Sequence, residues 1–325
     1  MNDSSRCVLV TGASGFAGSH LLEHLASPDV ASAFRRKELV AWSRSTRPAA
    51  LAALATWQQV DLLDRDRVRD AIRELRPSAV YHCAGAAQVV SSWTDTAATL
   101  SSNVLTTHYL LDAVRRAPST SCRILLIGSA TMYRPAATPL GEDAPVSPTS
   151  PYAVSKFAQE QLGLRALQED GVDVVLTRSF NHTGPRQTPG FFAPARARPI
   201  AALARGAEPV IHAGNLDAER DLTDVRDVVR AYALLMERGA PGTVYNVASG
   251  VGRSMRSVLD GLVQRARVPM TIVPDPARLR PHDIPTLIGN PERLRHATGW
   301  APAIPFDRTL DDLLDYWRTL PERSR

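Results

Sequence analysis

The stretch Cys7-Val-Leu-Val-Thr-Gly12-Ala-Ser-Gly15-Phe-Ala-Gly18 joins a short apolar run to a segment of helical spacing that continues to about residue 26. An apolar run that ends in Thr-Gly predicts a buried strand, and the glycines predict a tight turn into a helix. Glycine also lets backbone N–H groups approach a pyrophosphate, to which the helix N-terminus adds positive potential. The spacing differs from G-x-G-x-x-G, but the strand–turn–helix context favours a dinucleotide site over a structural turn.

The same alternation continues through the first half of the chain. Apolar runs of strand type lie at 39–42, 57–60, 79–83, 123–127 and 172–179, and helical spacing marks 94–116 and 152–170. Strands separated by helices predict a parallel sheet covered on both faces, which is a Rossmann-like, doubly wound α/β fold.

The second half of the chain is less regular. Helices are expected near 191–205, 225–238, 256–267 and 307–320, and a strand at 243–247 is expected to return to the main sheet. We therefore predict a dinucleotide-binding domain of 1–178 plus 225–250, and a smaller, discontinuous domain of 179–224 plus 251–325 that binds substrate.

Composition excludes several classes of protein. The 44% hydrophobic and 22% charged content is ordinary for a soluble globular protein. The charge of +5 comes from scattered arginines without interleaved aromatics, so no nucleic-acid partner is expected. No apolar stretch reaches 18 residues, so no membrane span is expected. Cys7, Cys83 and Cys122 lie far apart in apolar runs, which predicts buried thiols in a reducing, cytoplasmic location.

Lys156 is one of only two lysines in the chain, and it follows Tyr152 by four residues. Ser150-Pro151 predicts a helix start just before this pair, and positions i and i+4 share one face of a helix. A nearby ammonium favours the ionised phenol, so the spacing predicts a lowered pKa for Tyr152 and an acid/base role.

The end of the second expected strand bears on the choice of dinucleotide. It reads Trp42-Ser43-Arg44-Ser45, with no carboxylate of the kind that would favour NAD. Arg44, with Ser43 or Arg47, could pair with a 2′-phosphate, which favours NADP. If Arg44 instead stacks over the adenine, NAD stays possible. Asp61-Leu62 after the third strand is expected to border the adenine.

A series of short motifs extends over most of the chain: Thr11-Gly12-x-x-Gly15-x-x-Gly18, Asp61-Leu62, His82-Cys-Ala84-Gly85, Asn103, Ser129, Tyr152-x-x-x-Lys156, Arg178-Ser-Phe-Asn181, Arg220-Asp-Leu-Thr-Asp-Val-Arg-Asp227, Tyr245-Asn-Val-Ala-Ser-Gly250 and Gly299-Trp300. In their residues and in their order along the chain, these motifs resemble those of the extended short-chain dehydrogenase/reductase family. The resemblance implies an enzyme that modifies a nucleotide-linked sugar with a nicotinamide cofactor. The first predicted domain would bind the cofactor, and the second would bind the nucleotide sugar.

The resemblance also implies a catalytic triad of Ser129, Tyr152 and Lys156. In it, Lys156 would bind the nicotinamide ribose, while Tyr152 and Ser129 would meet the sugar C4 oxygen. The implied cofactor contacts are Gly12, Gly15, Phe16, Gly18, Ser43, Arg44, Asp61, Leu62, Ala84, Gly85, Ala86, Asn103, Tyr152 and Lys156. The implied substrate contacts are Ser91, Ser129, Asn181, Arg220, Arg280 and Asp283, with Arg220 and Arg280 on the diphosphate.

For other residues near these motifs, the sequence allows two different roles. Ser91, Ser92 and Trp93 could line the sugar pocket or could cap the next helix. His182 could lie at the nicotinamide edge or pack in a loop. His20 and His24 lie four residues apart without a third ligand, so no metal is expected.

The residues that follow Ser129 restrict the set of reactions that the enzyme is expected to catalyse. Sugar 4,6-dehydratases of the family carry acidic residues there, whereas this chain has Ala130-Thr131, so dehydration is not expected. Glu142 and Asp143 are expected to be solvated loop charges.

Two chemistries remain. One is NADPH-dependent reduction of the C4 keto group of a GDP-type 4-keto-6-deoxy-hexose. Segments 181–191 and 275–300 resemble those of enzymes that catalyse this reduction. The other is NAD-dependent 4-epimerisation, since segment 129–133 resembles the corresponding segment of 4-epimerases. The NADP-type strand end favours reduction. A noncatalytic NAD(P)-binding regulator is the third hypothesis.

The helices predicted at 94–116 and 152–170 carry more apolar surface than a two-sided sheet needs. In the resembling family, such helices pair with those of a second copy to form a four-helix interface. The resemblance thus implies a homodimer, with a monomer as the alternative.

Overall fold

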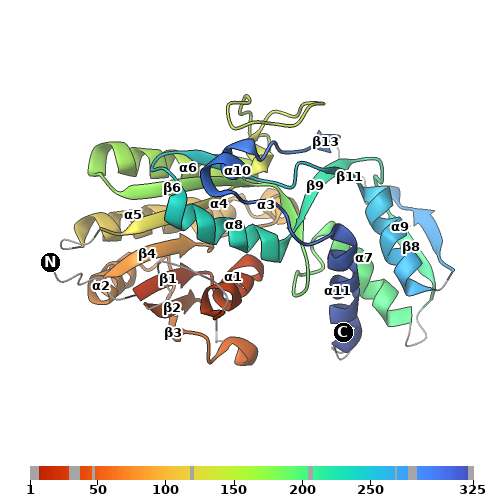
Figure 1. Cartoon of the computed structure of the whole chain (residues 1–325), viewed down its shortest axis with the longest axis horizontal. Coiled ribbons are helices and arrows are strands. Elements are labelled where there is room, and N and C mark those ends of the chain that lie inside the picture. Colours follow the sequence, from red (N-terminus) through yellow and green to blue (C-terminus); the bar gives the residue numbers. More distant parts are fainter. Residues whose placement is uncertain are drawn as a thin grey trace.

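The computed structural model describes residues 7–28, 37–45, 48–117, 121–203, 208–267, 269–276 and 284–320. Its main element is a parallel sheet of seven strands in the order β10-β6-β5-β4-β1-β2-β3 (Figure 1). The strands are β1 (Cys7–Thr11), β2 (Glu38–Ser43), β3 (Thr56–Gln59), β4 (Pro77–His82), β5 (Arg123–Ser129), β6 (Asp173–Ser179) and β10 (Val244–Val247). The predicted Rossmann-like fold is confirmed, and the strand expected at 243–247 pairs with β6 as the sheet's last strand.

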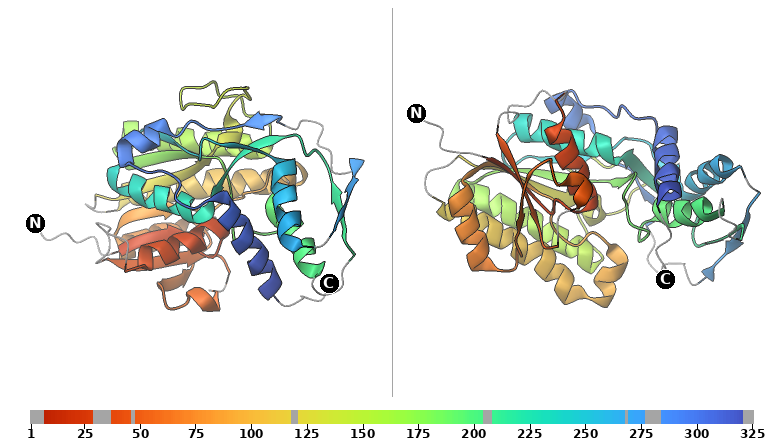
Figure 2. Two further views of the ribbon diagram at one scale, coloured as in Figure 1. Left: turned by 45° about the vertical axis from the view of Figure 1, so that its right-hand side comes forward. Right: turned by 90° about the horizontal axis from the view of Figure 1, so that it is seen from below.

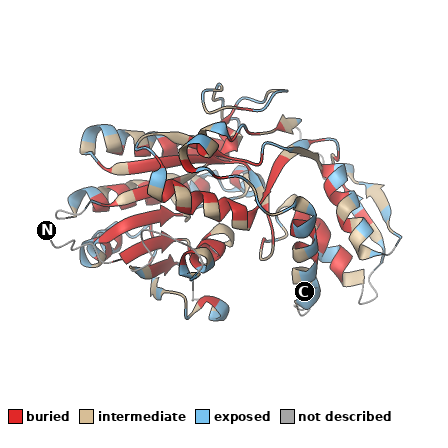
Figure 3. Ribbon diagram, viewed as in Figure 1, coloured by how far each residue is buried: buried red, intermediate tan, exposed pale blue. Residues whose placement is uncertain are grey.

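Helices cover both faces of this sheet, as Figure 2 shows with red α1 and teal α8 on one side and orange α2 and yellow α5 on the other. Their bounds are α1 (Phe16–Ala26), α2 (Arg65–Leu75), α5 (Thr106–Arg116), α6 (Pro151–Asp170) and α8 (Val225–Arg238). Alternate side chains of β1 enter the two cores, Val8 and Val10 under α1 and α8, and Leu9 under α2 and α5. The central strands β1 and β4 are accordingly buried along their whole length, whereas the edge strand β3 is only partly buried (Figure 3).

The helix expected at 94–116 is interrupted in the structure. It consists of α3 (Val89–Thr94), α4 (Thr96–Leu100), the π-helical turn η2 (Ser101–Leu105) and α5. The Asp95 side chain accepts a hydrogen bond from the Ala98 N–H and so starts α4 anew. Single π-turns inside helices are frequent at functional sites, and this one carries Asn103.

The second half of the chain builds a smaller group of elements beside the sheet, at the right of Figure 1. They are β7 (Asn181–Thr183), α7 (Phe192–Ala202), β8 (Val210–Ala213), β9 (Glu219–Asp224), β11 (Gly252–Ser254), α9 (Met255–Ala266), β12 (Thr271–Pro274), β13 (Thr286–Leu287) and α11 (Phe306–Thr319). Strands β11, β9 and β13 form one small sheet, joined by β7, and β12 pairs with β8. Apolar residues of α7, α9 and α11 form a separate core.

Three further short elements complete the described chain. They are η1 (Ala49–Leu51), η3 (Ala130–Met132) and α10 (Glu292–Thr298). Leu294 of α10 and the following Trp300 belong to the core under α1 and α8, although they lie late in the sequence. The boundaries of the two predicted domains stay a prediction. Among the described residues, no helix is both long and apolar enough to cross a membrane.

Candidate active site

The glycine turn after β1 is closely packed against the end of β4. Gly12 has φ +65°, and a Cβ there would lie 2.7 Å from the Ala84 Cα. A Cβ on Gly18 would lie 2.3 Å from the Gly12 carbonyl oxygen, so α1 can approach the turn only with glycine at this position. No side chain caps the N-terminus of α1 at Gly15. The backbone is thus open toward an anion, and these residues fit a dinucleotide pyrophosphate.

A second close approach joins the end of β4 to the π-turn. Gly85 has φ +145°, and a Cβ there would lie 2.3 Å from Asn103 Oδ1. Asn103 Nδ2 donates to the Ala86 carbonyl at 3.3 Å and to Ser155 Oγ at 2.8 Å. Its Oδ1 is buried and has no hydrogen-bond partner in the described part of the chain. Asn103 therefore ties the end of β4 to α6 and keeps one acceptor available.

Ser129, Tyr152 and Lys156 come together where β5 ends and α6 begins. The Ser150 side chain accepts from the Ala153 N–H at 3.1 Å, which starts α6 one residue before Tyr152. Ser129 is the last residue of β5, and its hydroxyl interacts with the Tyr152 phenol and acts to lower its pKa. All three predicted triad side chains are buried, and each is less than 9% exposed.

The Lys156 ammonium is held by two acceptors. Its Nζ donates to the Ile127 carbonyl of β5 at 2.9 Å and to Gln159 Oε1 at 2.9 Å. Burial lowers the pKa of Lys156 to about 8, because an ammonium loses its hydration there. Neither partner of Lys156 was predicted. Only the folded chain brings the Ile127 carbonyl to it, whereas Gln159 lies three residues further along the same helix.

The pKa of Tyr152 is shifted in the direction opposite to the prediction. Burial raises the pKa of the phenol above its usual value, and the hydrogen bond with Ser129 offsets only part of this. The physical reason is that the desolvation of the phenolate dominates, while the Lys156 ammonium is directed to Ile127 and Gln159. Tyr152 is consequently a protonated acid in this structure.

A buried chain of hydrogen bonds runs beneath the site through His82, which is 1% exposed. Thr107 Oγ1 donates to the Asn103 carbonyl at 2.7 Å, so it must accept from His82 Nε2, 3.0 Å away. The neutral imidazole then accepts at Nδ1 from Thr11 Oγ1, at 2.8 Å. Thr11 precedes Gly12, so the chain connects the glycine turn to Asn103. Burial, then the charge of Lys156, lowers the pKa of His82 to about 3.

The end of β2 presents an exposed arginine, Arg44. Arg44 is exposed, and within the described residues it makes no ion pair. Its carbonyl accepts from Gln59 Nε2 at 3.0 Å, which fixes the backbone of the strand end. Asp61 Oδ1 accepts from the Leu63 N–H at 3.0 Å, and Leu62 is buried. Arg47 lies outside the described residues.

The residues predicted to hold the substrate are dispersed over several elements. Asn181 lies exposed on β7, and Arg220 on β9 donates from Nη1 to the carbonyls of Glu219 at 2.8 Å and Pro285 at 3.4 Å. Ser91 Oγ donates to the Gln88 carbonyl from inside α3, so the alternative that Ser91 caps a helix is wrong. Arg280 and Asp283 lie outside the described residues.

His182 packs against the first residue of α1. Its ring stacks on Phe16 with centroids 5.8 Å apart and an interplanar angle of 8°. His20 Nε2 donates to the Pro185 carbonyl at 2.9 Å, so this histidine has a structural partner. The loop after β7 is thereby joined to the helix that follows the glycine turn. No cluster of His, Cys, Asp or Glu among the described residues has the arrangement of a metal site.

Glu142 does not behave as the solvated charge that was expected. Its side chain is 6% exposed and accepts from the Asn246 N–H of β10 at 2.9 Å, with Arg293 3.6 Å away. Asp143 is exposed as expected and pairs with Arg293 at 2.9 Å. The buried carboxylate of Glu142 thus anchors the loop before α6 to the sheet.

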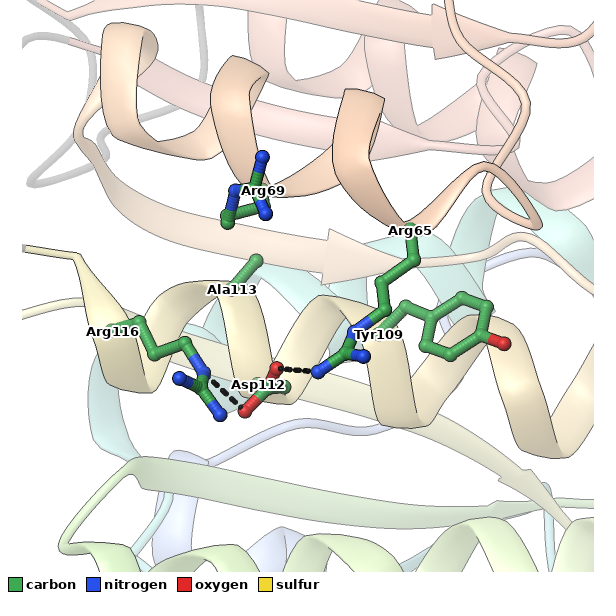
Figure 4. A pocket seen from close by; sticks show the side chains of 6 residues that line it. All are labelled: Arg65, Arg69, Tyr109, Asp112, Ala113 and Arg116. Carbon is green, nitrogen blue, oxygen red and sulfur yellow. Dashed lines mark hydrogen bonds and ion pairs between the residues drawn. The ribbon is translucent and has the colours of Figure 1, made fainter.

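A hollow between α2 and α5 is lined by arginines (Figure 4). Asp112 accepts hydrogen bonds from Arg65 at 3.2 Å and from Arg115 and Arg116 at 2.8 Å each. Burial raises the pKa of Asp112, but these three guanidinium groups outweigh it and hold the pKa well below its usual range. The hollow is a surface ion-pair cluster that contains none of the predicted site residues.

The parallel seven-stranded sheet, the glycine turn after β1 and the buried Ser–Tyr–Lys group define a dinucleotide-binding enzyme of the short-chain dehydrogenase/reductase class. The family model described as GDP-mannose 4,6 dehydratase matches residues 9–313. The chain belongs to this family of NAD(P)-dependent nucleotide-sugar dehydratases, reductases and epimerases, within the extended short-chain dehydrogenases/reductases.

Three relatives cover nearly the whole chain. The GDP-6-deoxy-D-mannose reductase of Pseudomonas aeruginosa is 37% identical over 96% of this chain and 97% of its own. The UDP-glucose 4-epimerase of Azospirillum brasilense is 31% identical over 91% of this chain and 87% of its own. The structure of RMD from Pseudomonas aeruginosa complexed with NADPH matches with a TM-score of 0.84 and 34% identity, over 97% of this chain and 99% of that chain.

Proposed function

We propose that this protein reduces the C4 keto group of a nucleotide-linked 4-keto-6-deoxy-hexose with NADPH, and that the nucleotide is GDP. The observation that carries the proposal is the buried Ser129, Tyr152 and Lys156 group followed by the non-acidic pair Ala130-Thr131. Such a site can exchange a proton at C4 but has no carboxylate after Ser129 for dehydration. The 37% identity with a GDP-6-deoxy-D-mannose reductase supports this choice of reaction and substrate.

The cofactor would lie across the carboxyl ends of the strands. Gly12, Gly15 and Gly18 would hold its pyrophosphate at the uncapped start of α1, and Arg44 with Ser43 would meet the 2′-phosphate of NADP. When bound, the reduced nicotinamide supplies the hydride. The other proposed contacts are Phe16, Asp61, Leu62, Ala84, Gly85, Ala86, Asn103, Tyr152 and Lys156.

Tyr152 would supply the proton for the reduction. As C4 becomes tetrahedral, its oxygen gains negative charge, which a hydrogen bond from Ser129 would stabilise. The phenol would then transfer its proton to that oxygen, and the Lys156 ammonium would stabilise the phenolate that is left. The raised pKa of Tyr152 suits this direction, because it keeps the phenol protonated until the alkoxide forms.

The substrate would be held by residues from both halves of the chain. Arg220, Arg280 and Asn181 are proposed contacts of the diphosphate, and Asp283 of the nucleotide ribose. Ser91 would line the sugar pocket together with Ser129. These roles rest on the family resemblance and on the placement of Asn181 and Arg220 on the paired strands β7 and β9.

We also propose that the protein forms a homodimer through η2, α5 and α6. Leu105 and Val154 on this face are 41% and 43% exposed, which is high for large apolar side chains. The three described cysteines are free thiols, which agrees with a cytoplasmic location. Sedimentation equilibrium of the wild type and of Val154→Glu tests the dimer, since only the wild type should reach twice the monomer mass.

The experiment that tests the reaction follows NADPH oxidation with GDP-4-keto-6-deoxy-mannose. We expect turnover with the wild type and loss of turnover in Tyr152→Phe while NADPH binding survives. If no nucleotide-linked 4-keto sugar oxidises NADPH, the proposed reaction is wrong.

One observation favours a second function, a 4-epimerase. The relative that is 31% identical is named UDP-glucose 4-epimerase, and segment 129–133 resembles such enzymes. An epimerase would retain NAD through purification, since its cofactor undergoes no net change. The nucleotide released from denatured, purified protein therefore discriminates the two functions.

A further inference from the structure

Gln159 of α6 contacts the lysine of the candidate triad directly. It lies three residues after Lys156, and residues at this spacing share one face of a helix. Gln159 is 1% exposed, and its Oε1 accepts a hydrogen bond from Lys156 Nζ at 2.9 Å. The carbonyl of Ile127 in β5 is the other acceptor, also at 2.9 Å. Gln159 therefore belongs to the buried surroundings of Lys156, although it lies outside the motif that joins Tyr152 to Lys156.

The ammonium fixes which way the Gln159 amide points. An ammonium can only donate hydrogen bonds, so the amide must present its oxygen to Lys156. The amide nitrogen Nε2 is then left buried, and it has no hydrogen-bond partner among the described residues. An unpaired buried N–H group costs free energy of folding, which an apolar side chain of the same size would avoid. The contact with Lys156 thus explains a glutamine at a position that packing alone would give to an apolar residue.

Two fixed acceptors determine the direction of the whole ammonium. An ammonium has three N–H donors in a tetrahedral arrangement, and Ile127 and Gln159 occupy two of them. No third acceptor comes from the part of the chain that the structure describes. The third N–H remains for the nicotinamide ribose, the partner that the family resemblance implies for Lys156. Of the two acceptors, only Gln159 is a side chain, so a substitution can remove it.

Gln159 holds the ammonium without neutralising its charge. Cys83 and His82, at the end of β4, lie close enough to Lys156 for its charge to act on them. Burial raises the pKa of the Cys83 thiol to about 12, which Lys156 only partly opposes, and burial and then Lys156 lower the pKa of His82 to about 3. Both groups are therefore uncharged at neutral pH, and so is the phenol of Tyr152. The positive charge of Lys156 thus stays available to a phenolate at Tyr152.

The carboxylate that follows Gln159 in the sequence does not change this. Glu160 accepts from Arg178 Nε at 2.8 Å and from Arg178 Nη2 at 2.7 Å, so both of its oxygens are bound to one guanidinium. Both side chains of this ion pair are buried. Helix α6 thus directs a neutral acceptor toward Lys156 and a charged acceptor toward β6.

We infer that Gln159 is a positioning residue of the active site, which directs the Lys156 ammonium while leaving its charge to act on the cofactor and on Tyr152. The inference rests on the proposed function, since it adds a residue to the same site. Gln159→Met removes the acceptor and keeps nearly the same volume, whereas Gln159→Glu keeps the acceptor and adds a negative charge. The two variants therefore test position and charge separately.

The test uses the fact that the chain has only two lysines. Enzyme labelled with ¹³C at the lysine Cε gives two NMR signals, and Lys37→Arg identifies the signal of Lys156. In the cofactor-free enzyme, we expect this signal to titrate near pH 8. Gln159→Met should move the midpoint about one pH unit lower, because the buried ammonium loses an acceptor. Gln159→Glu should move it about one pH unit or more higher, because a carboxylate stabilises the ammonium.

Binding and turnover give a second readout. Gln159→Met should weaken NADPH about 10-fold in fluorescence titration, because the ammonium is no longer directed. Gln159→Glu should lower kcat about 10-fold without changing the KM for GDP-4-keto-6-deoxy-mannose, because the new ion pair withdraws the charge of Lys156 from Tyr152. Gln168→Met is the matched control, because Gln168 is an exposed glutamine of the same helix, and it should change none of these quantities.

The inference is overturned by an unchanged midpoint in Gln159→Met, by a shift of both variants in the same direction, by wild-type NADPH affinity in Gln159→Met, or by an equal effect of Gln168→Met. If Gln159→Met does not fold, Gln159→Glu decides alone, and a midpoint at or below that of the wild type overturns the inference. If the midpoints move as expected but the wild type oxidises no NADPH with any nucleotide-linked 4-keto sugar, only the proposed reaction is overturned.

Discussion

Acidification should destabilise this protein through His82. Both nitrogens of the His82 ring already make hydrogen bonds, because Nε2 donates to Thr107 Oγ1 and Nδ1 accepts from Thr11 Oγ1. A proton added at Nδ1 would face a hydroxyl that is donating to it, in a site that water does not reach. The folded protein therefore binds this proton only near pH 3, whereas the unfolded chain binds it near pH 6.5.

The sign and the size of the effect follow from this difference. Since the unfolded state binds more protons between these values, stability falls as the pH drops below 6.5, by about 1.4 kcal/mol per unit. Between pH 7 and pH 4.5, His82 should remove about 2.5 kcal/mol from the free energy of unfolding. This is a large part of the stability of an ordinary domain.

Guanidinium denaturation at the two pH values measures the loss. His82→Gln cannot take up the proton, so it should lose about 2.5 kcal/mol less than the wild type over the interval, even though it is less stable at pH 7. His296→Gln is the control, because His296 is 82% exposed. If His82→Gln and the wild type lose the same free energy on acidification, the hydrogen-bond directions assigned to His82 are wrong.

Three other predictions concern the cofactor half of the site. Gly18→Ala should lower the free energy of unfolding by about 1 to 3 kcal/mol and abolish NADPH binding, since its Cβ would lie 2.3 Å from the Gly12 carbonyl oxygen. Gly141→Ala is the control, because a Cβ there has open space and should change neither property. Thermal melting measures the stability, and fluorescence titration measures the NADPH binding. Lys156→Arg should reduce kcat by at least about 100-fold, because a planar fork cannot replace an ammonium held by Ile127 and Gln159; wild-type turnover in this variant would contradict that. Arg44→Ser should weaken NADPH about 10- to 100-fold and leave NADH unchanged in fluorescence titration, and equal losses for both would argue against a 2′-phosphate contact.

The main sheet could be predicted because each of its strands is a local signal. Runs such as Cys7–Thr11 and Arg123–Ser129 have an apolar interior, and glycine or a polar residue marks the end of each. The helix Arg65–Leu75 was missed because most of its surface is polar and only Val68, Ala71 and Ile72 are buried. The short strands β8, β9, β11, β12 and β13 were missed because their pairing depends on residues far away in the chain.

The candidate site likewise contains a part that the sequence could predict and a part that it could not. The triad and the glycine turn have fixed spacing within single elements, so the sequence was sufficient to find them. The Ile127 carbonyl that accepts from Lys156, the His82 chain and the pairing of β9 with β11 are contacts between elements, and no spacing reveals them. The sign of the Tyr152 pKa shift was wrong for the same reason, because burial is a property of the fold.

The most direct test of the central claim follows the hydride itself. NADPH carrying deuterium on the transferred position of its nicotinamide is incubated with the enzyme and GDP-4-keto-6-deoxy-mannose, and the product is analysed by NMR. We predict one deuterium at C4 of the sugar for each NADPH consumed, and none with Tyr152→Phe. A product without deuterium at C4, or a sugar inverted at C4 while NADPH stays intact, would contradict the account.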